Sequence, residues 1–147
     1  MCANRYIAYD FYKIVTELRP EWAEKKICSD GVILDDKDKK ELKPMEKIKL
    51  VMTRNKDDEK DLFDMLGTKD DRKEFDRQFK NPKSNFKIAI VVDMWLTGFD
   101  VPELDTIYID KPIQQHTLIQ TISRVNRVCE GKDKGLIVDY IGIKKNM

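Results

Sequence analysis

Two arginines near the C-terminal end of the sequence have the spacing and chemistry of a phosphate site. Arg124 and Arg127 follow Gln120 at helical spacing, so a helix would place all three on one face. The two arginines repel each other, and Gln120 is neutral, so it cannot relieve this repulsion as a glutamate would. A bound anion could relieve it. Phosphate is a suitable anion, because a guanidinium group binds it with two hydrogen bonds. The alternative interpretation is an ordinary solvated face. The apolar residues of the segment form an opposite stripe that is expected to face a sheet: Leu118, Ile122, Val125 and Cys129.

The segment TGFDVP contains a second candidate, the carboxylate of Asp100. It follows KIAIVVDMWL, a continuous apolar run typical of a strand that is buried on both faces of a parallel sheet. A plain turn would use Gly98 and Pro102 but would not need an acid between two hydrophobic residues. Parallel sheets bind ligands outside the carboxyl ends of their strands, so Asp100 is expected to face a ligand. The alternative is an ordinary loop that leaves the strand.

The remaining pattern alternates between strand and helix signals. Charged residues 35–47 are expected to form an exposed loop or a short helix, and residues 27–34 a short strand. The other predicted elements are a helix over 4–18, a strand over 48–53, a helical stretch over 62–79 interrupted at Gly67, a turn over 80–85, strands over 87–95, 106–110 and 135–140, and a helix over 113–129. This alternation predicts an α/β domain with a mostly parallel sheet.

Composition restricts the function classes. The chain has 147 residues, enough for one domain, and a net charge of +1, so bulk charge argues neither for nor against a nucleic-acid partner, and any basic surface must be local. Three cysteines without CxxC spacing and one histidine, His116, predict reduced thiols in a cytoplasmic protein and no metal site. No apolar run is long enough to span a membrane, and no signal pattern opens the sequence.

Two segments resemble superfamily 2 helicases. DMWLTGFDVP is similar to helicase motif V and QTISRVNR to motif VI, and both belong to the second RecA-like domain of those motors. The run from TGFDVP through SRVNRV to IVDY resembles more narrowly the restriction (R) subunit of type I restriction-modification enzymes. This resemblance implies a RecA-like three-layer α/β domain over residues 1–147, with a mostly parallel sheet flanked by helices and without its first strand. It also implies an ATP-driven translocase of double-stranded DNA.

The same resemblance implies roles on the nucleotide side. Arg124 and Arg127 match the two motif VI arginines, which act as arginine fingers on the terminal phosphates of ATP. Gly98 and Asp100 match the glycine and acid of motif V, and Gln120 matches the leading polar residue of motif VI. These three positions are therefore expected to contact the nucleotide or the arginines.

Two further residues are expected to contact DNA. Thr97 matches a motif V position that meets the nucleic-acid backbone, and Arg5 matches an arginine of motif IV that opens a helix. Ser123 stands where motif VI usually has glycine, and Thr97 where many RNA helicases have arginine, and both departures fit the R subunit. Val92 replaces a threonine of many relatives, so a phosphate contact from that side chain is not expected.

The sequence has no GxxxxGK[ST] loop and no DEAD-like acid pair. We therefore expect ATP and Mg²⁺ to be held mainly by a first RecA-like domain elsewhere in a longer chain, and the isolated fragment to be inactive. The implied partners are double-stranded DNA, the first RecA-like and nuclease domains of the same chain, and the modification and specificity subunits, with no membrane. The alternatives are a non-catalytic phosphate- or nucleic-acid-binding α/β module and the second domain of another superfamily 2 helicase.

Overall fold

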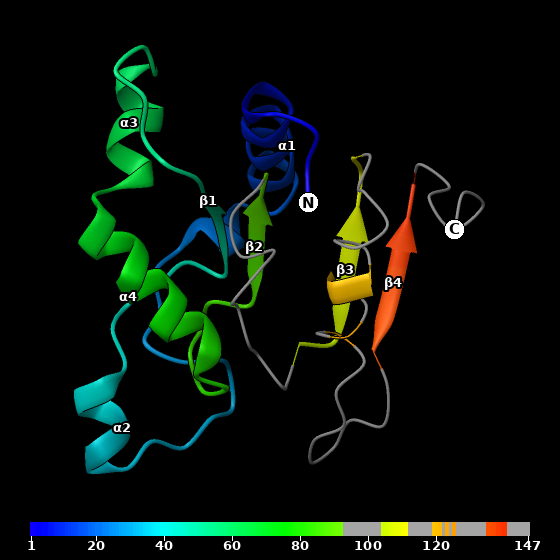
Figure 1. Cartoon of the computed structure of the whole chain (residues 1–147). Coiled ribbons are helices and arrows are strands. Elements are labelled where there is room, and N and C mark those ends of the chain that lie inside the picture. Colours follow the sequence, from blue (N-terminus) through cyan, green and yellow to red (C-terminus); the bar gives the residue numbers. More distant parts are fainter. Residues whose placement is uncertain (93–103, 112–118, 122, 124, 126–134, 141–147) are drawn as a thin grey trace. The chain divides into compact units, whose positions relative to one another are not determined.

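The computed structural model describes residues 1–92, 104–111, 119–121, 123, 125 and 135–140. They belong to two compact units: the central unit is Tyr9–Ile90, and the discontinuous unit combines Met1–Ala8 with Val91–Met147. In chain order the elements are α1 (Arg5–Leu18), the 3-10 turn η1 (Pro20–Ala23), α2 (Asp36–Glu41), β1 (Ile48–Val51), α3 (Lys60–Leu66), α4 (Lys69–Lys80), β2 (Ile88–Val91), β3 (Thr106–Ile109) and β4 (Leu136–Asp139) (Figure 1). None of the described helices combines the length and apolar character of a membrane span.

The described strands form two pairs, β1 with β2 and β3 with β4. The β3–β4 pair is parallel and in register from Thr106 opposite Leu136 to Ile109 opposite Asp139. This confirms the predicted α/β class and is compatible with part of a RecA-like domain. The strand predicted over 87–95 is present as β2, whereas residues 93–95 lie outside the described part of the chain.

The core of the central unit forms around β1. All four residues of this strand are buried, and the strand contacts both α3 and η1. The large side chains that are almost fully enclosed with it include Leu66 and Phe86, and the Phe86 ring lies 5.0 Å from that of Phe79 on α4, centroid to centroid. Ile88 and Ala89 of β2 are only half-buried. The prediction that the 87–95 run is enclosed on both faces is therefore wrong for the start of β2.

Local sequence sets the start of helix α1 and the boundary between α3 and α4. The Asn4 side-chain Oδ1 accepts a hydrogen bond from the Ile7 N–H at 2.9 Å, so α1 begins where the sequence predicted a helix start. Gly67, at φ +70°, separates α3 from α4, and a Cβ atom there would lie 2.8 Å from the Asp71 side chain. Thr68 and Asp71 then form a reciprocal capping box at the start of α4.

The charged stretch 35–47 forms the short helix α2, one of its two predicted states. Asp35 and Asp38 cap this helix reciprocally, and Leu42 and Met45 beyond it are each 5% exposed. Lys83, which follows α4 in the chain, donates a hydrogen bond to Asp38. The stretch is therefore tied to the central unit by an ion pair and two apolar side chains.

The Asp38–Lys83 pair makes stability depend on pH. The hydrogen bond from Lys83, followed by that from the Asp35 N–H, lowers the pKa of Asp38, while Asp38 raises the pKa of Lys83. A carboxyl group with a lowered pKa stabilises the fold above its unfolded pKa of about 3.9, and this contribution is lost as pH falls through the folded pKa. The raised pKa of Lys83 has the opposite sign, so its contribution is present below about 10.4 and is lost as pH rises through the folded pKa.

We expect Asp38→Asn to lower the free energy of unfolding at pH 7, and we expect this loss to shrink as pH approaches 3. Urea denaturation of both proteins at the two pH values measures the difference. Asp36→Asn is the matched control, because Asp36 is an exposed carboxylate in the same helical turn. A loss for Asp38→Asn that stays constant across this pH range would contradict the assignment.

The prediction of a short strand over residues 27–34 is wrong, because these residues form no strand in the structure. Isolated bridges join Lys26 to Met45 and Cys28 to Ser84, and the chain then turns, with the Val32 N–H donating to the Ser29 carbonyl. The turn is possible because Gly31 takes φ +78°, a conformation that strands exclude. Ile33 is left 91% exposed, so the apolar residues of this run are not all core residues.

Candidate nucleotide and DNA site

The carboxyl edge of the β3–β4 pair carries acidic side chains. Asp139 ends β4 opposite Ile109, and Asp110 follows β3 directly. The Tyr140 N–H donates to the Ile109 carbonyl at 3.0 Å, which continues the pairing to the end of both strands. Because the strands are parallel, both carboxylates emerge at the same edge, where α/β sheets bind their ligands.

The first two residues of the chain extend this pairing within the discontinuous unit. The Met1 ammonium donates to the Tyr108 carbonyl at 2.8 Å, and the Asp110 N–H donates to the Met1 carbonyl at 3.0 Å. The Cys2 N–H donates to Val91, the last residue of β2, at 2.8 Å. Met1 thus bonds to the end of β3, and Cys2 bonds to the end of β2. Burial lowers the pKa of the Met1 ammonium and raises the pKa of the Cys2 thiol.

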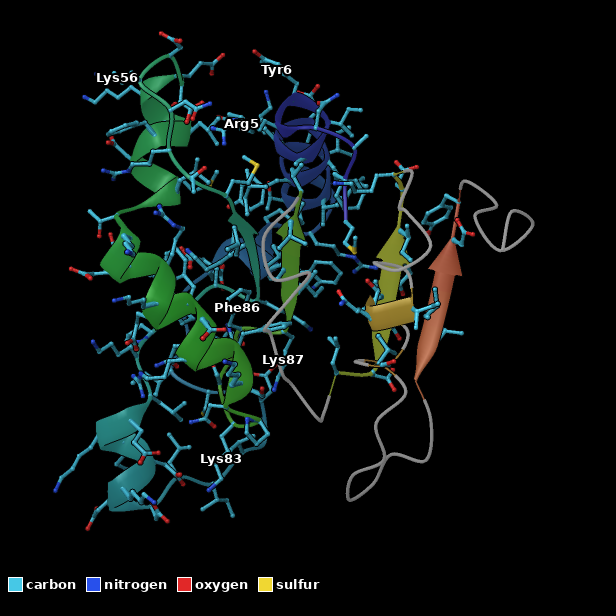
Figure 2. The ribbon with its side chains drawn as sticks, viewed as in Figure 1. Arg5, Tyr6, Lys56, Lys83, Phe86 and Lys87 are labelled. Atoms are coloured by element: carbon cyan, nitrogen blue, oxygen red, sulfur yellow. The ribbon has the colours of Figure 1, made fainter. Side chains whose placement is uncertain are left out.

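Helix α1 begins directly after this paired segment. Arg5 is its first residue and is half-buried, in the helical turn that Asn4 caps (Figure 2). The prediction that Arg5 opens a helix is therefore confirmed. A helix N-terminus favours anions, and an arginine in the first turn adds a positive charge there. Its expected contact with DNA stays a prediction.

Lys111 connects the ends of two strands in the same unit. Its Nζ donates to the Val92 carbonyl at 2.9 Å, and the side chain is half-buried. Val92 follows β2 and immediately precedes residues 93–103, which include TGFDVP. Lys111 therefore holds the point at which the main chain leaves β2. The sequence pattern did not predict a role for Lys111, although a cation directly following the acid in IDKP is a signal that could have indicated one.

A helix before β4 has one buried side and one exposed side. Residues 119–121, 123 and 125 are helical, with Thr121 2% and Val125 1% exposed and Gln120 on the solvent side. A Cβ atom on Gly135, just before β4, would collide with the side chain and carbonyl of Val125. Glycine is thus needed where the helix and the strand approach each other. The core position of Val125 is confirmed, whereas the burial of Thr121 was not predicted.

The comparison with known families decides the identity of this fold. Residues 4–142 match the family described as Type I restriction enzyme subunit R domain 3. The chain belongs to this family.

Curated relatives of the chain are also named as subunits of type I restriction enzymes. The chain is 38% identical over 148 residues to the type I restriction enzyme HindI endonuclease subunit of Haemophilus influenzae, covering 99% of the chain and 12% of the relative. A protein of Methanocaldococcus jannaschii, named as a predicted type I restriction enzyme MjaIXP endonuclease subunit, is 51% identical over 102 residues, covering 69% of the chain and 10% of the relative. The domain 3 chain thus spans about a tenth of the length of these relatives.

Most of the predicted site residues of this domain 3 chain lie outside its described residues. Thr97, Gly98 and Asp100 fall within 93–103, and Arg124 and Arg127 are also outside. Gln120 is described, and it is exposed as predicted from its helical phase. The nucleotide-binding roles of these residues, and the DNA-binding roles of Thr97 and Arg5, therefore stay predictions.

Two cations of the central unit have structural partners. The Arg54 guanidinium lies over the Phe63 ring, 4.1 Å from its centroid, and donates to the Phe63 carbonyl at 3.0 Å, which holds α3 against the end of β1. Lys49 is 8% exposed, pairs with Glu46 at 3.0 Å and lies 4.3 Å from the Phe75 centroid. Both groups stabilise domain 3 itself, so neither is a candidate phosphate ligand.

Proposed function

We propose that this chain is the second motor domain of an ATP-dependent double-stranded DNA translocase, in the R subunit of a type I restriction endonuclease. Membership of the domain 3 family over residues 4–142 is the observation that carries the proposal. The names of the relatives as endonuclease subunits support an enzymatic parent protein. The parent is proposed to act in the cytoplasm, with modification and specificity subunits.

In this proposal the domain supplies one wall of an ATP site. Arg124 and Arg127 would meet the terminal phosphates of ATP, whose Mg²⁺ and phosphates are held mainly by the first RecA-like domain. Gly98, Asp100 and Gln120 would orient the nucleotide or the arginines. The exposed position of Gln120 supports this arrangement, because the polar side chain is available to a partner outside its own helix.

The nucleotide site is proposed to lie at the carboxyl edge of the strands. Asp110 and Asp139 emerge at this edge, and Lys111 donates to the Val92 carbonyl, just before residues 93–103, which include TGFDVP. ATP would bridge this domain and the first RecA-like domain, and closure and reopening would alternate the grip on the DNA backbone. Thr97 and Arg5 would contribute to the DNA contact.

Triplex displacement by the full restriction complex tests this proposal. A third strand bound downstream on duplex DNA is expected to be released only when ATP is present and hydrolysed, because translocation strips it from the duplex. A non-hydrolysable ATP analogue serves as the control and should leave the triplex intact. DNA binding without DNA-stimulated ATP hydrolysis would instead favour the non-catalytic binding module and would end the motor assignment.

A further inference from the structure

Helix α1 carries an apolar stripe that remains open to solvent. Ile7, Phe11, Ile14 and Leu18 recur at steps of four, three and four. Their exposed fractions are 42%, 49%, 55% and 74%. With about 100° of rotation per residue, these four positions fall within about 60° of one another. They form one continuous strip along the helix, which we call the α1 stripe.

The α1 stripe differs from the side of the helix that packs inward. Ala8 is fully buried, and Tyr12 is half-buried, with burial and the nearby Glu46 carboxylate both raising its pKa. Val15 is also half-buried. The helix has therefore already used one side for its own fold. The α1 stripe is a second apolar side without a covering element among the described residues.

The charges beside the α1 stripe are balanced. Lys13 pairs with Asp10 at 3.5 Å, and the helix contains two basic and two acidic side chains, the other two being Arg5 and Glu17. Amphipathic helices that bind anionic membranes or nucleic acid carry an excess of Lys and Arg on their polar face. This helix lacks that excess, so its chemistry fits an apolar protein surface.

The 4-3-4 spacing also indicates the shape of the occupant. Apolar residues repeating at this spacing form the seam along which two helices pack with their axes nearly aligned. The domain 3 chain spans 12% of its Haemophilus relative, so a full subunit would have ample further polypeptide to supply the second helix. Permanent interfaces are more apolar than transient ones, so the apolar character of the α1 stripe favours a permanent contact, such as one within a single polypeptide.

We propose that the α1 stripe is the docking face for an amphipathic helix from another domain of the same R subunit polypeptide. Ile7, Phe11, Ile14 and Leu18 are the seam on the domain 3 side. This inference rests on the proposed function only in taking the chain to be one domain of a full R subunit. It does not depend on ATP hydrolysis.

Cysteine labelling of the full-length R subunit tests the proposal. Ile14→Cys places a thiol in the stripe, and Lys13→Cys places one on the adjacent charged side, where the lysine side chain is 55% exposed. Native cysteines are separated from the new thiols by peptide mass spectrometry. Maleimide is expected to modify the thiol at position 14 at least about tenfold more slowly than that at position 13, because access would require local opening. Both rates should become equal in denaturant.

A photo-crosslinking amino acid at position 11 identifies the polypeptide that covers the α1 stripe. If Ile14→Cys does not fold, the labelling is done instead with Phe11→Cys in the stripe and Asp10→Cys beside it. A crosslink to the same polypeptide, at a residue outside this domain, supports the proposal. Equal native labelling at the two positions would overturn it. A crosslink to a second copy or another subunit, or protection that disappears on dilution, would also overturn it. Both the labelling rates and ATP turnover are also measured on the Arg124→Ala subunit. Unchanged ATP turnover in this variant would contradict the motor assignment, whereas the labelling rates test only the α1 stripe.

Discussion

Replacing Arg124 or Arg127 by alanine in the full-length R subunit is expected to lower ATP turnover by about 10³–10⁵-fold, the effect of removing an arginine finger. The guanidinium group would stabilise the charge that develops on the transferring phosphoryl group, and alanine offers no replacement. ATP binding should be largely retained, because most ground-state contacts would come from the first RecA-like domain. Steady-state hydrolysis and fluorescent-nucleotide binding measure the two quantities separately.

Two comparisons make this experiment selective. Arg124→Lys keeps the charge but loses the planar fork, so it should recover little of the rate. Arg19→Ala removes an exposed arginine just beyond α1, whose nearest acidic partner, Glu21, is 3.8 Å away, and should leave turnover unchanged. Near-normal hydrolysis by both Arg124→Ala and Arg127→Ala would remove the arginine-finger assignment.

Phe86→Ala should destabilise the chain by about 3–5 kcal/mol, as expected for the loss of a fully buried aromatic side chain. Phe86 is 1% exposed, and it lies between α4 and the start of β2 (Figure 2). Its ring packs on Phe79 at 5.0 Å, and its N–H bonds to Ser84 at 3.2 Å. Removing the ring leaves a cavity under this junction, which the surrounding backbone cannot readily fill.

Chemical denaturation followed by tryptophan fluorescence measures this loss. Phe86→Leu should lose less stability, because leucine fills more of the space than alanine does. Ile33→Ala is the control for simple loss of apolar surface, since Ile33 is 91% exposed, and should change stability by less than about 0.5 kcal/mol. A loss below about 1 kcal/mol for Phe86→Ala would show that the core does not depend on this ring.

Periodicity predicted that helix α1 exists but not which of its apolar residues form the core. Six apolar positions between residues 4 and 18 have helical spacing, yet Ala8 is the residue of this helix that is fully buried. A periodic pattern records which residues avoid water in the complete protein. It does not record which neighbour covers each one, so the α1 stripe became visible only in the structure.

At the predicted nucleotide site, too, the sequence predicted the features that depend on local helix geometry but not the contacts between distant segments. The spacing of Gln120, Arg124 and Arg127 depends on helix geometry alone, and the exposure of Gln120 agrees with it. Lys111 was not predicted, because its partner Val92 lies 19 positions away and is a main-chain carbonyl with no signature in sequence. The bonds from Met1 and Cys2 to distant strands were missed for the same reason.

The amino-acid sequence alone predicted helix α1, strands β1 to β4, the break at Gly67 and the α/β class, because these follow from local conformational preferences and from repeats of about two and 3.6 residues. The tertiary structure decided the burial of Lys49 and Thr121, the anchoring of α2 through Asp38 and Lys83, and the close approach of Gly135 to Val125. These features depend on residues brought together from separate segments. A charged or polar side chain becomes a core residue only when such a partner satisfies it, and local sequence does not contain that partner.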